Sequence, residues 1–281
     1  MPGKLYVVAT PIGNLSDMTP RGVQVLSEVD MIAAEDTRHS RVLLNHFKIS
    51  TPSFSCHKFN EEKRGDFFIS ALLDGKNIAL ISDAGTPCIS DPGHKLVSMA
   101  AEAGAEVIAV CGANAAAAAL SVSGFDASNF TFLGFLPRSK KEQNEIFQAM
   151  PNTPLVFYES PLRITKTLTW LAEGFQDADI CLCNDLTKRY ERIYRGNPTD
   201  ILEEIENNPS AQKGEYTCVV HLNAKPQEAA EDEQSLEAQL INIIVKQNCT
   251  LKDAANILHQ SQKKNKKAIY AATLRLKELL I

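Results

Sequence analysis

Acidic residues stand directly after three apolar runs in this sequence, where their carboxylates could take part in chemistry. They are the pair Glu35 and Asp36, then Asp83, then Glu159. The carboxyl ends of parallel strands form the edge of a sheet at which open α/β proteins bind ligands. A carboxylate there can act as a general base, and crowding two carboxylates together raises the pKa of one of them. The pattern therefore predicts acidic groups at a ligand-binding edge.

A purely structural interpretation stays open for the same residues. Asp36 or Thr37 would cap a helix that starts near Arg38. Glu159 and Arg163 are four positions apart and could pair with each other on a helix. If these groups face a ligand instead, the two arginines supply the cations that a phosphate-bearing substrate needs.

The stretch ISDAGTPCISDPG, residues 81–93, forbids regular structure for about ten residues. A crossover from a strand to a helix usually takes about two to six residues. Long loops rich in glycine and proline bring the backbone close to a ligand, so this stretch is predicted to be a binding loop. Asp91-Pro92-Gly93 is interpreted as its end and the start of the next helix.

Two further turns accompany this loop. The stretch ATPIGNLSDMTPRG, residues 9–22, follows the first apolar run, and CGANAAAAALSVSG, residues 111–124, follows a later one. The run of alanines either packs tightly on a strand or leaves room for a bound molecule, and both interpretations stay open. The nucleotide motifs G-x-G-x-x-G and the P-loop are absent from the sequence.

Short apolar runs alternate with helix-like stretches over the first two hundred residues, which is typical of α/β units. Strands are expected at 5–9, 31–34, 78–82, 106–110, 130–134, 155–158, 180–184 and 216–222. Helices are expected between them, at 21–29, 38–47, 94–103, 113–121, 140–149 and 162–173. The alternation restarts after FLPRSKKEQ, residues 135–143, so we predict two α/β lobes.

The predicted domains are an N-terminal α/β lobe at 1–112, a second α/β lobe at 113–224, an acidic linker at 225–234 and a helical appendage at 235–281. Residues 227–237 contain five acids and no base, a linker composition. In the appendage, 236–245, 251–259 and 267–280 show apolar residues at helical spacing. Thr250 and Asp253 have the spacing of a capping box.

The segment 262–278 is strongly basic, although the whole chain has a net charge of -5. It contains six basic residues against one acidic residue, and the basic ones are Lys263, Lys264, Lys266, Lys267, Arg275 and Lys277. Any attraction to nucleic acid must therefore come from a local patch such as this one. The alternative is a solvated helix face.

Composition narrows the class of protein. The chain has 281 residues, 44% of them hydrophobic and 22% charged, as in ordinary globular proteins. No run approaches the roughly 18 apolar residues of a membrane span, and the N-terminus lacks a signal-peptide layout, so no membrane association and a cytoplasmic location are expected. The seven cysteines form no C-x-x-C pairs that would indicate a zinc site.

Four irregular strings together resemble one known family. VVATPIGNLSDMTPRG, AAEDTRHSRVLL, ALISDAGTPCISDPG and VFYESPLRI closely resemble the ribosomal RNA small subunit methyltransferase I family, within the tetrapyrrole methylase-like superfamily. The resemblance runs from about Lys4 to Leu222. It implies a homodimeric two-lobe enzyme with S-adenosyl-L-methionine in the cleft between the lobes. The implied reaction is methylation of the ribose 2'-hydroxyl of a cytidine in the decoding region of 16S rRNA, in the small ribosomal subunit.

The resemblance also implies a set of cofactor-binding residues. The cofactor loop would consist of Asp83, Ala84, Gly85, Thr86 and Pro87, with Pro11 from the first turn. Gly112, Asn114 and Ala115 occupy the place of a small-residue turn that usually reads Pro-Gly-x-Ser/Cys. Here Cys111 replaces the proline and Asn114 replaces the small residue.

Methyl transfer to a hydroxyl needs in-line positioning and removal of a proton from a very weak acid. Our candidates for proton removal are Glu35, Asp36 and Glu159, with Arg38 and Arg163 anchoring RNA phosphates. Of the basic residues in the appendage, Lys263, Lys264, Lys266, Lys267 and Arg275 are predicted to contact RNA phosphates. No metal is required.

Two other classes of function remain to be distinguished. A tetrapyrrole or precorrin-type methyltransferase would share the lobes and the cofactor, but would not need the EDTRHS and ESPLR strings or the basic tail. A DNA-binding regulator with a cofactor-sensing body would use the helical appendage, yet its acidic body would repel a duplex.

Overall fold

The computed structural model describes residues 1–281 except 59–60, 151–152, 224–235, 248, 263–265 and 280–281; in the helices, the side chains at 61–63, 247, 260–262, 266–268 and 278–279 also lie outside the description. The chain divides into two compact units, Met1–Asn223 and Ala224–Ile281. The predicted acidic linker, 225–234, lies outside the described residues. Each unit is described below by itself.

The first lobe is built on a five-stranded sheet in the order β3-β2-β4-β1-β5. All of its neighbouring strands are parallel. The strands are β1 (Lys4–Val8), β2 (Met31–Ala34), β3 (Ser53–Ser55), β4 (Ile78–Ile81) and β5 (Glu106–Val110). The carboxyl ends of all five strands therefore lie along one edge of the sheet.

The central strand β4 is buried on both faces, as its unbroken apolar run predicts. Ile78 and Leu80 join a core with α3 (Glu61–Leu73) and α4 (His94–Glu102). Ala79 and Ile81 join a core on the other face with α1 (Pro20–Glu28) and α2 (Thr37–His46). A single 3-10 turn, η1 (Leu15–Asp17), precedes α1.

The second lobe has a sheet in the order β6-β7-β10-β8-β9. Its strands are β6 (Thr131–Phe135), β7 (Leu155–Glu159), β8 (Asp179–Asn184), β9 (Arg192–Gly196) and β10 (Tyr216–His221). β6 and β7 are parallel, and the remaining pairs are antiparallel, so the sheet is mixed.

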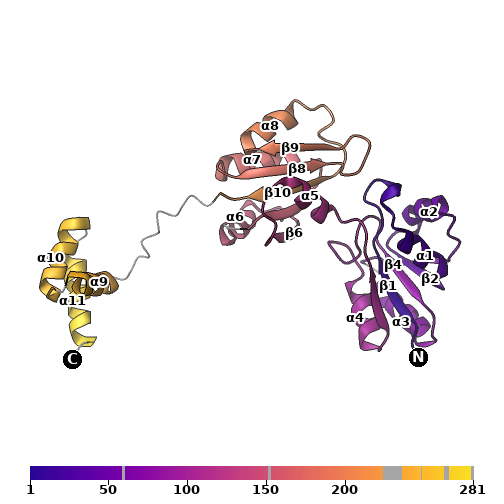
Figure 1. Cartoon of the computed structure of the whole chain (residues 1–281), viewed down its shortest axis with the longest axis horizontal. Coiled ribbons are helices and arrows are strands. Elements are labelled where there is room, and N and C mark those ends of the chain that lie inside the picture. Colours follow the sequence, from indigo (N-terminus) through magenta and orange to yellow (C-terminus); the bar gives the residue numbers. More distant parts are fainter. Residues whose placement is uncertain (59–60, 151–152, 224–235, 248, 263–265, 280–281) are drawn as a thin grey trace. The chain divides into compact units, whose positions relative to one another are not determined.

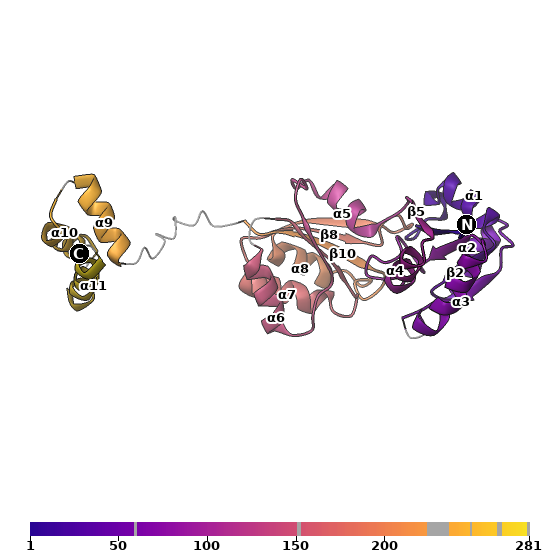
Figure 2. The same ribbon diagram turned by 90° about the horizontal axis from the view of Figure 1, so that it is seen from below.

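Helices cover both faces of this second sheet (Figure 2). On one face α6 (Lys140–Ala149), α7 (Ile164–Gly174) and α8 (Pro198–Glu206) share a core that includes Phe147, Trp170 and Phe157. On the other face α5 (Ala115–Ser123) packs its alanines against Val156, Cys181 and Val219. Figure 1 shows α5 entering this lobe directly from the first one.

The C-terminal unit consists of α9 (Leu236–Gln247), α10 (Leu251–Gln262) and α11 (Lys266–Leu279). Its core contains residues from all three helices, such as Leu240, Leu258 and Leu276. Thr250 is confirmed as the N-cap of α10: the Asp253 amide donates to the Thr250 hydroxyl at 3.3 Å, and that hydroxyl donates to the Asp253 carboxylate. In the part of the chain that is described, no helix is both long and apolar enough to cross a membrane.

The predicted α/β class with two lobes and C-terminal helices is confirmed. Two strands were not predicted. β3 is three residues long and β9 carries two arginines in five residues, so neither shows a strong apolar run. The helix expected at 162–173 begins at Ile164 instead, because Pro161 to Arg163 form a turn.

Candidate active site

The loop after β4 is fastened to the end of β1 by backbone hydrogen bonds. The Thr10 amide donates to the Gly85 carbonyl at 2.8 Å, and the Gly85 amide donates to the Thr10 carbonyl at 3.0 Å. The Thr10 hydroxyl also donates to the Ser82 carbonyl at 3.3 Å. These contacts hold the loop at the carboxyl edge of the parallel sheet.

The same loop holds several residues in the left-handed region. Gly85 has a φ of 78°, and two non-glycine residues, Cys88 and Ser90, have φ values of 69° and 66°. For the two non-glycine residues such a conformation costs about 1–3 kcal/mol each, and it persists where the surrounding structure imposes it, often at functional sites. The many glycine and proline residues of this loop are thus explained by the path that its backbone takes.

A pocket of about 320 Å³ lies between this loop and the second lobe. Its walls combine apolar side chains with loop backbone and a few acids. It is lined by Ile12, Ala84, Gly85, Thr86, Ile89, Ser90, Asp91, Asn114, Ala115, Phe135, Tyr158, Glu159, Ser160, Pro161, Leu186, Glu215, Tyr216 and Thr217. A largely apolar pocket with few convergent polar groups is typical of small-molecule sites.

The predicted cofactor residues divide into two groups. Ala84, Gly85, Thr86, Asn114 and Ala115 line the pocket. Pro11, Asp83 and Pro87 are adjacent in sequence to lining residues, and Gly112 lies two positions before Asn114, but these four do not themselves line the pocket. A Cβ on Gly112 would lie 3.0 Å from the Cβ of Ala9, so Gly112 permits close packing between the ends of β1 and β5.

Asn114 also shapes the pocket wall through its cap. Its side chain accepts a hydrogen bond from the Ala117 amide at 3.0 Å and so begins α5. The Thr86 hydroxyl donates to the Ala113 carbonyl at 3.1 Å, which ties the β4 loop to the start of that helix. The helix cap and this contact therefore give a structural reason for Asn114 at a position where a small residue is usual.

Three carboxylates converge at this edge of the sheet. The Asp36 amide donates to the Asp83 carboxylate at 3.1 Å, and the Asp83 amide donates to the Glu35 carboxylate at 3.4 Å. Burial raises the pKa of Glu35. Burial, and then the negative charge of Glu35, raise the pKa of Asp91 to about 6. Asp91 lines the pocket, whereas Glu35 does not.

Asp91 was not among the predicted site residues. The sequence interpretation assigned Asp91-Pro92-Gly93 to the end of the loop and the start of α4. Gly93 is indeed the residue before α4, but it makes no side-chain cap, and Asp91 faces the pocket. The signal that could have found it is a second Ser-Asp pair in a loop already predicted to bind a ligand.

Asp36 is engaged by its neighbour. Its carboxylate accepts from the Arg38 amide at 2.8 Å and lies 2.7 Å from the Arg38 guanidinium. These hydrogen bonds hold the pKa of Asp36 well below its usual range. The capping interpretation is confirmed, and such a weakly basic carboxylate is poorly suited to remove a proton.

Glu159 and Arg163 pair with each other, as their spacing allows. The Glu159 side chain is fully buried, and it accepts from the Ser160 amide and the Thr167 hydroxyl, both at 2.8 Å. The Arg163 guanidinium lies 3.3 Å from Glu159 and also donates to the Leu136 and Pro137 carbonyls. The structure thus favours a positioning role over proton removal and phosphate binding.

Two aromatic rings meet at the pocket. Phe135 and Tyr158 line it, with ring centroids 5.7 Å apart in an edge-to-face arrangement. The pairing of β6 with β7 shifts register before Phe135, and Gly134 there has a φ of 62°. A Cβ on Gly134 would lie 2.8 Å from the Ser90 hydroxyl, so the irregular strand end fits directly against the β4 loop. Phe135 remains 58% exposed.

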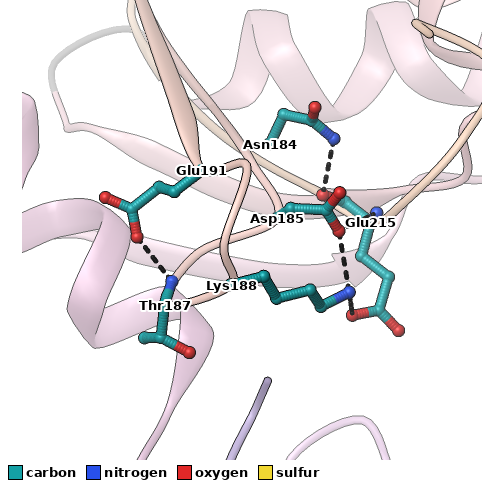
Figure 3. A network of polar contacts seen from close by, with 6 residues as sticks. All are labelled: Asn184, Asp185, Thr187, Lys188, Glu191 and Glu215. Carbon is teal, nitrogen blue, oxygen red and sulfur yellow. Dashed lines mark hydrogen bonds and ion pairs between the residues drawn. The ribbon is translucent and has the colours of Figure 1, made fainter. Parts of the chain in front are cut away.

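A polar network fixes the loop between β8 and β9 (Figure 3). The Lys188 ammonium donates to Asp185 at 2.7 Å and to Glu215 at 3.0 Å. The Asp185 amide donates to the Glu215 carbonyl at 2.9 Å. Leu186 and Glu215 line the pocket, so this network shapes the second lobe's wall. A Cβ on Gly13 would lie 2.4 Å from the Lys188 side chain, which explains a glycine in the first lobe's turn.

The predicted RNA-contacting residues are not brought together by the described structure. Lys263 and Lys264 lie outside the described residues, and Lys266 and Lys267 are on α11 with side chains that are not described. The Arg275 guanidinium is 2.6 Å from the Glu237 carboxylate and thus joins α11 to α9. Arg38, by contrast, has an 87% exposed side chain beside the β4 loop.

Comparison with solved structures supports the fold. A diphthine synthase matches with a TM-score of 0.62 at 13% identity, covering 78% of this chain and 90% of that one. A uroporphyrin-III-C-methyltransferase from Thermus thermophilus matches with a TM-score of 0.53 at 19% identity, covering 78% and 94%. At these identities the likeness shows the fold alone.

Comparison with curated proteins gives much closer relatives. A protein named "Ribosomal RNA small subunit methyltransferase I" from Synechocystis sp. is 42% identical over 279 residues, covering 98% of both chains. One of the same name from Halalkalibacterium halodurans is 45% identical, covering 82% of this chain and 79% of the relative. One from Haemophilus influenzae is 40% identical over 95% of both.

The sequence profile of the Tetrapyrrole (Corrin/Porphyrin) Methylases matches residues 4–202, which include the β4 loop and most of the second lobe. The relatives span nearly the whole chain, including the C-terminal unit. Together these matches confirm the resemblance drawn from the four sequence strings. The chain belongs to the ribosomal RNA small subunit methyltransferase I family, within the tetrapyrrole methylases.

Proposed function

We propose that this protein transfers a methyl group from S-adenosylmethionine to the ribose 2'-hydroxyl of a cytidine in the decoding region of 16S rRNA. Family membership carries the coarser statement: the protein is an S-adenosylmethionine-dependent methyltransferase of small-subunit rRNA. The atom, the nucleoside and the region are our proposal. The observation that carries the chemistry is a carboxyl group with a raised pKa, Asp91, in the pocket.

The pocket suits the proposed cofactor. Ile12, Ile89 and Leu186 provide apolar surface for an adenosyl group, while Asp91 and Glu215 provide negative charge near a sulfonium. A Cβ on Gly85 would lie 3.3 Å from the Ile12 side chain and would fill space in the pocket. Because glycine has no Cβ, the backbone at Gly85 stays open to a ligand. When bound, S-adenosylmethionine supplies an electrophilic methyl group on sulfur.

The protein's own residues would position the hydroxyl and accept its proton. The hydroxyl oxygen must reach about 3–3.5 Å from the methyl carbon, in line with the bond that breaks. Asp91 is our candidate to take the proton as the new carbon–oxygen bond forms. A carboxylate with a pKa of about 6 is ionised at neutral pH and is more basic than an ordinary aspartate.

The aromatic pair offers a place for the target base. Phe135 is more than half exposed and lines the pocket, and its ring is fixed by Tyr158 and by the strand end that Arg163 holds. Proteins that bind unpaired RNA bases commonly stack them on such rings. We propose that Phe135 stacks on the nucleobase, and that exposed Arg38 contacts a neighbouring phosphate.

The proposal also includes a homodimer and a cytoplasmic location. The dimer is what the resemblance to the family implies. A single species of about 31 kDa by light scattering would contradict the dimer.

Replacing Gly85 by Ala tests the cofactor loop against a matched control. Gly85 and Gly104 have φ values of 78° and 76°, but Gly104 has open space around its missing Cβ. Alanine should lower the free energy of unfolding by about 1 kcal/mol at either site, because the left-handed region is unfavourable to L-residues. Calorimetric titration with S-adenosylmethionine should show weaker binding for Gly85→Ala only. Equal affinities for both variants would exclude the loop from the cofactor site.

Replacing Asp91 by Asn tests proton removal. In the wild type, kcat/KM should rise with pH through about 6, and Asp91→Asn should lower it by about 100-fold or more and remove that rise. The matched Asp36→Asn variant should keep the rise, because the pKa of Asp36 is shifted the other way. A normal pH profile in Asp91→Asn would rule out this base.

The Asp91→Asn variant should be more stable than the wild type above pH 6. The folded-state pKa of Asp91 exceeds its unfolded value of about 3.9, so the carboxyl stabilises the fold below pH 4 and loses that contribution as pH rises through 6. Asparagine avoids the buried charge. After discounting for partial exposure, we expect a gain of about 1 kcal/mol at pH 8, measured by urea unfolding.

Replacing Phe135 by Ala tests base stacking. The variant should raise KM for the RNA substrate about tenfold, since a base–aromatic stack contributes about 1–3 kcal/mol. Phe130→Ala is the control, because Phe130 is similarly exposed in the same segment but does not line the pocket. If the two variants behave alike, Phe135 is not the platform.

A comparison of acceptors separates the proposal from its alternative, a tetrapyrrole or precorrin-type methyltransferase. Purified small ribosomal subunits and a precorrin-type compound are offered to the full chain with labelled S-adenosylmethionine. We expect label in the RNA and none in the small molecule. Transfer to the small molecule alone would establish the alternative.

A further inference from the structure

A groove runs between α10 and α11 of the C-terminal unit. It has a volume of about 340 Å³, within the range of ligand-sized cavities. It is lined by Leu251, Lys252, Ala255, Asn256, His259, Ile269, Tyr270, Thr273 and Lys277. Of the lysines that line it, Lys277 alone belongs to the basic segment 262–278, and it was not among the residues predicted to contact RNA.

Helical spacing arranges these side chains into a floor and a rim. On α10, Lys252, Asn256 and His259 follow at intervals of four and three, so they share one face. On α11, Tyr270, Thr273 and Lys277 do the same. Leu251, Ala255 and Ile269 supply the apolar floor. The result is an apolar slot between two polar edges.

The charge of the groove favours an anionic ligand. Lys252 and Lys277 are exposed, one on each helix, and no acidic residue stands among those that the structure describes along the groove. The nearby described acids are engaged elsewhere: Asp253 accepts from Thr250, and Glu237 pairs with Arg275. A phosphate at either edge would therefore meet positive charge with little local repulsion.

Tyr270 gives the groove an aromatic face. It is 66% exposed, although a tyrosine ring is large and apolar enough to be buried at low cost. An exposed ring beside lysines is the combination with which proteins hold unpaired nucleotides.

We propose that this groove binds one unstacked nucleotide of single-stranded rRNA, with the base on Tyr270 and the flanking phosphates at Lys252 and Lys277. The exposed amide of Asn256 can hydrogen-bond to a base edge. An apolar floor suits a splayed-out base, whereas RNA duplexes are bound mainly through phosphates and 2'-hydroxyls. This inference rests on the proposed RNA substrate and gives the C-terminal unit a defined contact.

The test measures binding of the full chain to a fluorescent single-stranded RNA of about 12 nucleotides. Tyr270→Ala should weaken binding about 5- to 100-fold, and Tyr270→Phe, which keeps the ring, should restore it. Lys252→Glu and Lys277→Glu should each lower the slope of log affinity against log salt by about 0.7 or more. A duplex RNA of the same length should show little response to Tyr270→Ala.

Lys246→Glu is the matched charge control, because Lys246 is exposed on α9 and does not line the groove. It should leave the affinity close to that of the wild type. Equal affinities for Tyr270→Ala and the wild type would overturn the inference. A loss of dimer mass in Tyr270→Ala without a loss of RNA affinity would show that a second copy occupies the groove. The increase in melting temperature on adding S-adenosylmethionine is measured for each groove variant. It should equal that of the wild type, which separates these outcomes from failure of the proposed function.

Discussion

The paired backbone hydrogen bonds between Thr10 and Gly85 are the constraint on which the rest of the site depends. They fix the loop after β4 to the end of β1 at the open edge of the parallel sheet. From that fixed point the loop reaches the second lobe twice, through Thr86 at the start of α5 and through Ser90 against Gly134. The backbone path of this loop therefore defines much of the pocket between the lobes. This is why the sequence of the loop is rich in glycine and proline.

That geometry also concentrates negative charge. The Asp83 amide donates to the Glu35 carboxylate across the ends of β4 and β2, and Asp91 returns to the same region from the far end of the loop. Burial, and then repulsion between neighbouring carboxylates, raises the pKa of both Glu35 and Asp91. We propose that this arrangement both attracts a cationic cofactor and provides a proton acceptor. The stability lost through such crowding is characteristic of sites selected for activity.

Much of the fold and part of the site could be predicted from the sequence. The run Ile78 to Ile81 is apolar throughout because both faces of β4 are covered, and the alternation of runs revealed two lobes. The β4 loop was predicted to bind a ligand because its length and composition exceed what a crossover needs. The short strand β3 and the arginine-bearing β9 were missed, because their pairing is decided by neighbouring strands rather than by their own residues.

The individual roles were harder to predict, because they depend on contacts between distant segments. Spacing alone left Asp36 and Glu159 open as either structural or catalytic, and the structure shows both engaged by a nearby arginine. Asp91 looked like a turn residue, since nothing local reveals that Glu35 lies close enough to shift its pKa. Similarly, Tyr270 and Lys252 are 18 positions apart, and only the packing of α10 on α11 brings them into one groove.

The most direct test of the account is to locate the transferred methyl group. Small ribosomal subunits lacking the modification are incubated with the full chain and S-adenosylmethionine, and the RNA is then digested and analysed by mass spectrometry. The account predicts one added methyl group, on the ribose of a cytidine in the decoding region. A methyl group on a base, on another nucleoside or outside that region would contradict it.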